Sequence, residues 1–375
     1  MKIVYCINGV YNSGGMERVL MNKANYLTDV FGYEVLIVTT EQKGRDTFFT
    51  FSPRIRFVDL GINYDDDKDN PLWIRLIKKR KRQRIHKQRL EKLLNDEKAD
   101  VCISMFDRDV DFLYKIKDGS KKVLEYHFSK NVKMIEARNT LIRWMQKIRI
   151  EGWESLAQKY DRFVVLTEED KEAWGNLSNI VVIPNALSFF PTETAPLNDK
   201  NVLSVGRISH QKGFDRLVDA WKMVNARHPE WRLRIRGNGD KEELLNQIAA
   251  LGLKDSIQVL PATSEIDTEY LHSSIYVMSS RYEGFGLVLI EAMSYGLPIV
   301  SFACPCGPKD IITHGVDGFL CEDGDINDLA QRIFLLIEDD NLREKMGKAA
   351  KEKSLHFSAE EIMKLWKNML VELAT

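Results

Sequence analysis

Two glutamates in the stretch RYEGFGLVLIEAMSYGLP, residues 281–298, have a spacing that suits ligand chemistry. Glu283 and Glu291 are separated by seven residues, and a Gly-Phe-Gly turn follows the first of them. The apolar run after this turn predicts a helix that ends at the closing Gly and Pro residues. Glu283 then precedes the helix, and Glu291 lies about one and a half turns into it, roughly 8 Å further along the axis.

The helix start between these carboxylates offers backbone amides to an anion. Amides of a first helical turn have no partner inside the helix, and here they belong to Phe285, Gly286 and Leu287. A carboxylate, an anion site and a second carboxylate match a ligand with hydroxyls on both sides of a phosphate. A sugar nucleotide has that pattern. The simpler alternative is that Glu283 only compensates the helix dipole.

A second polar loop lies in VGRISHQKGFDRLVDAW, residues 205–221, after another strand-like run. Arg207 and Lys212 stand just before a predicted helix, next to Gly206 and Gly213. A guanidinium fork and a point charge at the carboxyl end of a strand suit a diphosphate. Taken as isolated residues, they would more simply be solvated surface cations.

A third turn, NGVYNSGGMERVL, occupies residues 8–20. Gly14 and Gly15 allow a ligand to approach the backbone at a helix start, where the dipole favours anions. The run is not G-x-G-x-x-G, so the dinucleotide fingerprint is absent. Glycines that serve only a tight turn are the alternative.

Short runs rich in Val and Ile alternate with helical patterns, which is typical of βαβ units and parallel sheets. The predicted strands are residues 2–7, 33–40, 55–60, 100–105, 122–127, 162–167, 180–186, 201–207, 232–239, 256–262, 275–280, 298–304 and 318–324.

A polar run without periodicity, residues 188–200, interrupts this alternation and is typical of an interdomain linker. We therefore predict an α/β protein with two doubly wound Rossmann-like domains, residues 1–190 and 201–375, joined by a linker at 191–200. Ligands of such sheets bind where strand carboxyl ends meet, which predicts a cleft between the domains. The last helix, 358–375, is amphipathic and suits either domain, including the first.

The composition, 44% hydrophobic and 29% charged over 375 residues, is that of a globular chain large enough for two cores. Its sequence shows no run near the roughly 18 apolar residues of a membrane span, and its start, MKIVYCINGV, lacks signal-peptide segments. We expect a cytoplasmic protein with five reduced cysteines.

Charge is divided unevenly along the chain. Residues 1–190 hold 33 Lys and Arg against 27 Asp and Glu, a net charge of +6, and the remainder holds 21 against 28, a net charge of −7. Residues 75–92 alone contain ten Lys and Arg and one Glu. Such a run suits an anionic lipid surface, where each basic residue contributes about 1 kcal/mol, or a nucleic acid. A solubilising helix face is the plainer alternative.

Three segments together, GRISHQKGFDRL, EGFGLVLIEAMSYGLPIV and GPKDIITHGVDGFL, closely resemble the retaining glycosyltransferases of family 4, which are group 1 glycosyltransferases with the GT-B fold. The resemblance covers most of residues 200–330. In the first half of the chain only Gly14-Gly15-x-Glu17, His127 at a strand end and Asn185 in VIPNA match.

The resemblance implies a role for each matching residue. Arg207 and Lys212 would neutralise the diphosphate leaving group, Glu283 would bind hydroxyls of the donor sugar, and Glu291 would hold the ribose hydroxyls.

In the first domain, the resemblance implies that Gly15 would lie close to the phosphates or the reacting centre, and that His127 would approach the donor sugar. Without it, His127 would be interpreted as a hydrogen-bonded core histidine.

The implied activity is transfer of a hexose or N-acetylhexosamine, with retention, from a nucleotide sugar that we expect to be UDP-linked. The acceptor would be a glycan or lipid-linked saccharide in cell-surface polysaccharide synthesis, at the inner face of the membrane. Because members of the family usually need no divalent metal, we expect no metal and no other cofactor.

Several rival functions remain. Asp107 and Asp109 have the D-x-D spacing of metal-dependent glycosyltransferases, and residues 65–69 are also acidic, but metal ligands must converge in space. A nucleotide-sugar epimerase is a further alternative, whereas a phosphorylase would need a pyridoxal phosphate lysine and a longer chain. A nucleic-acid-binding protein using residues 75–92 would leave the cations and glutamates of the second half without a role, so no nucleic-acid partner is expected.

Overall fold

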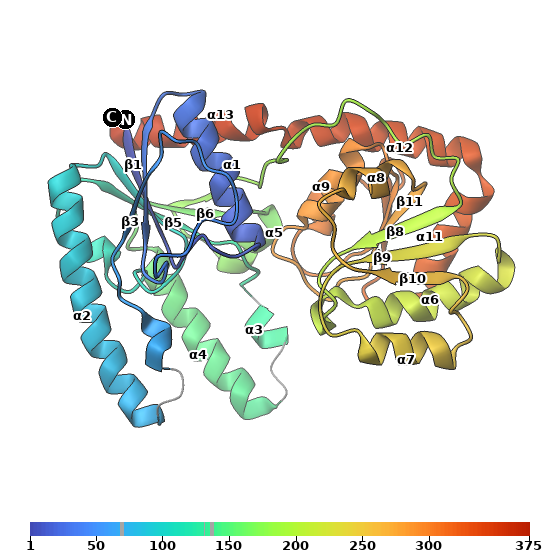
Figure 1. The fold of residues 1–375 in the computed structure, drawn as a ribbon, viewed down its shortest axis with the longest axis horizontal. Helices are drawn as coiled ribbons and strands as arrows, with labels where there is room; N and C mark the ends of the chain where they lie inside the picture. Colours follow the sequence, from blue (N-terminus) through green and yellow to red (C-terminus); the bar gives the residue numbers. More distant parts are fainter. Residues whose placement is uncertain (68–70, 131, 136–138) are drawn as a thin grey trace. The chain divides into compact units, whose positions relative to one another are not determined.

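The chain forms two compact units, each built on its own parallel sheet (Figure 1). The computed structural model describes residues 1–67, 71–130, 132–135 and 139–375. Unit 1 comprises Met1–Leu166, Asp170–Ser188 and Ala359–Thr375, and unit 2 comprises Thr167–Glu169 and Phe189–Ser358.

Unit 1 is built on a parallel sheet with the strand order β3-β2-β1-β4-β5-β6-β7. Its strands are β1 (Lys2–Ile7), β2 (Glu34–Thr39), β3 (Arg56–Asp59), β4 (Val101–Ser104), β5 (Lys121–Glu125), β6 (Arg162–Val165) and β7 (Ile180–Val182). Its helices are α1 (Gly15–Asp29), η1 (Tyr64–Asp67), α2 (Leu72–Glu97), η2 (Leu113–Lys115), α3 (Val132–Ile135), α4 (Thr140–Ala157), α5 (Glu168–Trp174), which begins in unit 2, and α13 (Ala359–Ala374).

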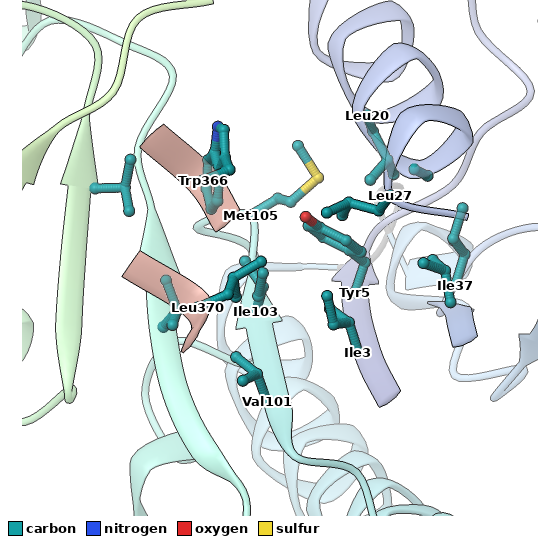
Figure 2. Close-up of a cluster of buried hydrophobic side chains, with 14 of the residues drawn as sticks. Ile3, Tyr5, Leu20, Leu27, Ile37, Val101, Ile103, Met105, Trp366 and Leu370 are labelled. Carbon is teal, nitrogen blue, oxygen red and sulfur yellow. The ribbon is translucent and has the colours of Figure 1, made fainter. Parts of the chain in front are cut away.

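The last helix, α13, completes a core of unit 1. Its apolar residues repeat at helical spacing, and the buried set comprises Ile362, Met363, Trp366, Met369, Leu370 and Leu373. Figure 2 shows Trp366 and Leu370 facing the buried strand residues Tyr5 and Ile103. The helix therefore supplies part of the layer that covers one face of the sheet.

Unit 2 has a second parallel sheet with the order β10-β9-β8-β11-β12-β13. Its strands are β8 (Asn201–Val205), β9 (Arg232–Arg236), β10 (Ile257–Leu260), β11 (Ile275–Met278), β12 (Ile299–Phe302) and β13 (Gly318–Cys321). Its helices are η3 (His210–Lys212), α6 (Phe214–Arg227), α7 (Glu242–Ala250), α8 (Ile266–Leu271), α9 (Leu287–Ser294), α10 (Pro308–Ile311), α11 (Ile326–Glu338), α12 (Asp340–Ser354) and η4 (Leu355–Phe357).

Each sheet has one point where the strand order reverses. In unit 1 it lies between β1 and β4, and in unit 2 between β8 and β11. Helices leave neighbouring strands on opposite faces at such a point, so the loops after those strands separate and leave a crevice for a ligand. The predicted α/β class with two doubly wound sheets is confirmed.

Residues 191–200, the predicted linker, contain no helix or strand. They nevertheless pack on unit 2, since the Ala195 amide donates to Tyr295 O at 2.8 Å and Arg343 Nε donates to Leu197 O at 3.1 Å. The chain therefore passes into unit 2 before the region predicted to join the domains.

Candidate functional site

Two loops of unit 2 lie against each other at its switch point, one after β8 (residues 206–213) and one after β11 (residues 279–286). The Arg281 amide donates to Gln211 O at 2.8 Å, and Gln211 Nε2 donates to Tyr282 O at 3.1 Å. The sheet order brings the loops together, and these bonds fix their relative position.

Lys212 and Glu283 form an ion pair between these loops. Glu283 is buried, and its Oε1 accepts hydrogen bonds from Lys212 Nζ at 2.6 Å and from Ser280 Oγ at 2.6 Å. The Glu283 amide donates to Pro305 O at 3.0 Å. A buried carboxylate is stable only when it is paired and hydrogen-bonded, and this one has both kinds of partner.

Two glycines make room for this arrangement. A Cβ on Gly206 would lie 2.9 Å from Cε of Lys212, and a Cβ on Gly213 would lie 2.2 Å from the backbone oxygen of Ser279. Gly213 also has φ +62°, which other residues rarely adopt. The glycines thus allow the lysine stem to lie along the loop and the two loops to approach.

Arg207 is the second predicted cation of this loop. Its side chain is exposed, and within the part of the chain that the structure describes its guanidinium has no ion pair or hydrogen bond. Arg207 therefore offers a fork of N–H donors to an anion at the carboxyl end of β8.

Glu291 lies on α9, which begins at Leu287 after Gly286 in a left-handed conformation, φ +94°. The glutamate is buried, and its Oε2 accepts a hydrogen bond from Tyr270 Oη at 3.2 Å. Phe285, by contrast, turns its ring into the core against Phe357, with ring centroids 5.9 Å apart. Only the backbone of Phe285 is therefore available to a ligand.

A third loop, after β12, borders Glu283 and escaped prediction. Cys306 has φ +60°, and its amide donates to Glu169 Oε2 at 2.9 Å. Gly307 has φ +110°, and a Cβ there would lie 1.9 Å from Phe285 O. Backbone in such regions persists only where its surroundings enforce it, often at ligand sites. The Cys-Pro-Cys-Gly run after a strand was the available signal.

In unit 1, Gly14 is the N-cap of α1 and Gly15 its first residue. A Cβ on Gly14 would lie 2.1 Å from Oε2 of Glu17, whereas nothing lies within 4 Å of a Cβ on Gly15. His127 follows β5, with its Nε2 3.0 Å from Glu125 Oε1. Both features stand at the carboxyl edge of the sheet of unit 1.

The D-x-D pair lies in the loop after β4. Burial raises the pKa of Asp109 to about 7, with Asp107 adding to the effect. Lys68 and Asp69 of the acidic run lie outside the described residues, and among those described no group of three or more His, Cys, Asp or Glu could hold a metal ion.

The basic run predicted at 75–92 lies within α2. One face of α2 and the loop after β3 form an open pocket of about 300 Å³, lined by Gly61, Ile62, Lys78, Lys81, Arg82, Ile85 and Arg89. Arg82 donates to the carbonyls of Ile62 and Asn63, and Arg89 donates to that of Leu60. Arg82 also pairs with Asp66 at 4.0 Å, so backbone carbonyls and one carboxylate hold the guanidinium groups, and the lining of the pocket is basic.

Comparison with known proteins identifies the family. A model for glycosyl transferases group 1 matches residues 188–353. An uncharacterized glycosyltransferase of Haemophilus influenzae is 32% identical over 375 residues, covering 98% of this chain and 99% of that protein. The chain belongs to the group 1 glycosyl transferases.

Some further relatives match only part of this chain, whereas solved structures of other proteins align with nearly all of it. A poly(ribitol-phosphate) alpha-N-acetylglucosaminyltransferase of Staphylococcus aureus is 31% identical over 215 residues, or 57% of this chain and 42% of that protein. The crystal structure of TarM aligns with a TM-score of 0.81 at 18% identity over 98% of both chains. Anabaena HepE in complex with UDP aligns with a TM-score of 0.75 at 19% identity, over 99% of this chain and all of that one. At these identities the structures show the fold, and the predicted GT-B fold is confirmed.

The structure thus brings together most of the predicted residues of this glycosyltransferase within each unit. Arg207, Lys212, Glu283 and the α9 start share the switch point of unit 2. Gly14, Gly15 and His127 share one edge of the sheet of unit 1.

Proposed function

We propose that this glycosyltransferase moves a hexose or N-acetylhexosamine from a UDP-sugar, with retention, to a glycan or lipid-linked acceptor in cell-surface polysaccharide synthesis. The observation that carries the proposal is the Lys212–Glu283 pair, which places a cation and a buried carboxylate beside a helix start at the switch point of unit 2. The family 4 assignment belongs to the same proposal.

The donor is proposed from complementary chemistry. Lys212 and Arg207 would receive the diphosphate together with the backbone amides at the start of α9. Glu283 would accept hydrogen bonds from the sugar hydroxyls, and Glu291 from those of the ribose. The S. aureus relative is named for N-acetylglucosamine transfer, and HepE was crystallised with UDP, which supports this donor class.

The reaction would proceed on one face of the sugar. The acceptor hydroxyl forms the new bond to the anomeric carbon as the bond to the diphosphate oxygen breaks, and its proton passes to a leaving-group phosphate oxygen. Arg207 and Lys212 stabilise the negative charge that develops on the diphosphate, which is the task of a metal ion in metal-dependent transferases. No metal is therefore required by this proposal.

Thermal unfolding with a panel of UDP- and GDP-sugars tests the donor assignment. A ligand that binds only the folded protein stabilises it by mass action, by about 2.7 kcal/mol when the free ligand is at one hundred times its Kd. The melting temperature rises accordingly. We expect a shift with UDP and a larger one with one UDP-sugar. The absence of a shift with every nucleotide sugar would overturn the proposal.

We further propose that unit 1 binds the cytoplasmic face of an anionic membrane. On α2, Trp73 is 65% exposed and Leu76 and Ile77 are also exposed beside the basic run, and on α4 Trp144 is 61% exposed next to exposed Met145. Exposed aromatic and apolar side chains among cations suit the interface of an anionic bilayer. In Figure 1, α2 and α4 both extend beyond the same end of the sheet of unit 1. Among the described residues, no helix is long and apolar enough to cross a membrane.

A further inference from the structure

Three ionisable side chains are buried together in unit 1. Lys23 of α1 is 4% exposed, Glu125 at the end of β5 is 1% exposed, and the side chain of His127, two residues later, is 5% exposed. Because burial of a charge costs several kcal/mol unless the charge is compensated, the contacts among these three groups determine their protonation.

Both basic groups meet the same oxygen of Glu125. Its Oε1 accepts a hydrogen bond from Lys23 Nζ, and Nε2 of His127 lies 3.0 Å from that oxygen, outside the alignment of an ideal hydrogen bond. An unprotonated Nε2 would direct its lone pair at a carboxylate, so the proton belongs on Nε2. The neutral ring then has its acceptor at Nδ1.

Lys23 has aromatic neighbours on its other sides. Its Nζ lies 3.9 Å from the centroid of the Trp366 ring and 5.3 Å from that of Tyr5, two side chains that Figure 2 shows in the same core. Aromatic faces attract a cation. The last helix therefore helps to keep the buried lysine charged.

The balance of charges leaves Glu125 ionised. Burial lowers the pKa of Lys23 and Glu125 opposes that shift. Burial alone would raise the pKa of Glu125, but the neighbouring Lys23 charge opposes burial and brings the pKa below its usual range. Since Lys23 matches the carboxylate charge, Glu125 does not need a histidine cation as its counter-ion.

We propose that Glu125 is a positioning residue that holds His127 in the Nε2–H tautomer, with Nδ1 presented to the donor sugar, and that Lys23 keeps Glu125 charged. The inference rests on the proposed function and on the place beside the donor sugar that the family resemblance implies for His127. Nδ1 would accept a hydrogen bond from a sugar hydroxyl, and its position would be fixed before the donor binds, which lowers the cost of ordering the site.

Nitrogen NMR of the full-length protein labelled with ¹⁵N-histidine tests the tautomer without any substrate. The chain has seven histidines, so His127 is assigned by the signal missing from a His127→Gln variant. We expect wild-type His127 to show a protonated Nε2 and an unprotonated Nδ1 at neutral pH. A protonated Nδ1 would overturn the proposal.

The matching kinetic test uses a variant without either charge. Glu125→Gln alone leaves Lys23 buried and unpaired, so Lys23→Met/Glu125→Gln is the variant to measure. With the UDP-sugar selected by the melting panel, we expect kcat to fall about tenfold or more, the size typical when a group that orients a histidine is lost, with UDP affinity unchanged. Wild-type kcat in this variant would overturn the positioning role.

A second buried pair on the same strand provides the control. Lys122, at the start of β5, pairs with Asp118, and both side chains are buried. Lys122→Met/Asp118→Asn removes the same two charges at the opposite end of the strand, and it should leave kcat unchanged at matched stability. An equal loss of kcat in both variants would mean that the Lys23–Glu125 pair only supports the fold.

Two replacements of His127 identify the nitrogen that acts. The amide of Asn occupies the region of Nδ1, and that of Gln the region of Nε2. We expect His127→Asn to retain several-fold more activity than His127→Gln, and the reverse order would contradict the proposal. If wild-type protein binds no nucleotide sugar, the proposed function fails, while the NMR result still decides the tautomer.

Discussion

At the scale of single residues, the ion pair between Lys212 and Glu283 changes what removal of the glutamate should do. The lysine that would bind the diphosphate is held by the carboxylate that would bind the sugar. We expect Glu283→Ala to weaken binding of the UDP-sugar about tenfold or more. UDP itself should bind as tightly as before or more tightly, because Lys212 loses its competing partner.

Glu291→Ala provides the contrast, because this residue is assigned to the ribose. It should weaken UDP and the UDP-sugar alike. Calorimetric titration of both variants with both ligands measures the difference. If Glu283→Ala weakened UDP as much as Glu291→Ala does, the division of the site between sugar and ribose would be wrong.

Asp109 should make unit 1 less stable as pH rises. Burial first, and then Asp107, raise its pKa to about 7, against an ordinary value of 3.8 in the unfolded chain. A raised carboxyl pKa costs nothing below pH 3.8, costs increasingly more between pH 3.8 and 7, and costs its full amount, roughly 4 kcal/mol, above that. Asp109→Asn should therefore stabilise the protein at pH 7.5, and the gain should disappear near pH 4.

The control for this pH dependence is Asp111→Asn, because Asp111 lies on the same segment and is exposed, with Gln83 as its partner at 3.1 Å. Urea unfolding at several pH values compares the two. A gain for Asp109→Asn that does not depend on pH would show that the carboxylate carries no such cost.

At the scale of elements, loss of the core contacts of α13 should destabilise unit 1. Trp366 is buried in the core of unit 1 and covers Lys23, so Trp366→Ala should destabilise unit 1 by about 3 to 5 kcal/mol. Leu365→Ala, on the exposed side of the same helix, should change stability by about 0.5 kcal/mol or less. Denaturant unfolding, followed by far-ultraviolet circular dichroism so that the signal does not depend on Trp366, measures the free energy of unfolding of both variants. Equal effects would mean that α13 does not complete the core.

The strands and helices were largely predictable from the sequence. Short apolar runs that alternate with helical patterns favour βαβ units, and such units form parallel sheets. Each described strand overlaps a predicted run, and each except β1 ends earlier than predicted, as β5 does at Glu125 instead of residue 127. Just past those ends single backbone hydrogen bonds to the neighbouring strand continue, as from the Tyr126 amide to Val164 O at 2.9 Å, but the regular ladder has ended. The amphipathic pattern of α13 indicates that one face of the helix packs on a core. The pattern does not indicate which of the two units supplies that core.

The site was predictable where the residue type carries the chemistry, as with Lys212 and Glu283. The contacts between distant segments were not. Glu125 and Lys23 are separated by 102 positions, and the residues next to them in sequence do not indicate that the two side chains form an ion pair. The same holds for the hydrogen bond from the Cys306 amide to Glu169, 137 positions away.

At the scale of the whole molecule, the uneven charge predicts where a membrane would act. Vesicles of phosphatidylglycerol and phosphatidylcholine should sediment the protein at low salt and release it at high salt, since surface charges are screened. Lys78→Ala/Lys81→Ala should weaken binding about thirtyfold, because each basic residue contributes about 1 kcal/mol.

Lys222→Ala/Lys254→Ala removes the same charge from exposed positions of unit 2, and it should leave vesicle binding unchanged. A wild-type protein that stays in the supernatant at low salt would end the membrane proposal. Equal losses for the two variants would mean that net charge alone, and not the surface of α2, drives the association.

The return of the chain to unit 1 at Ala359 also has a consequence for biosynthesis. The ribosome makes the whole of residues 189–358 before it makes the helix that completes the first core. At about 5 to 20 residues per second, the apolar face under Trp366 and Leu370 waits roughly 10 to 30 s for its cover, while unit 2 is already complete in sequence. A nascent chain stalled in that interval would expose the apolar residues of unit 1 that α13 later buries. We therefore expect a chaperone to bind the chain at this stage.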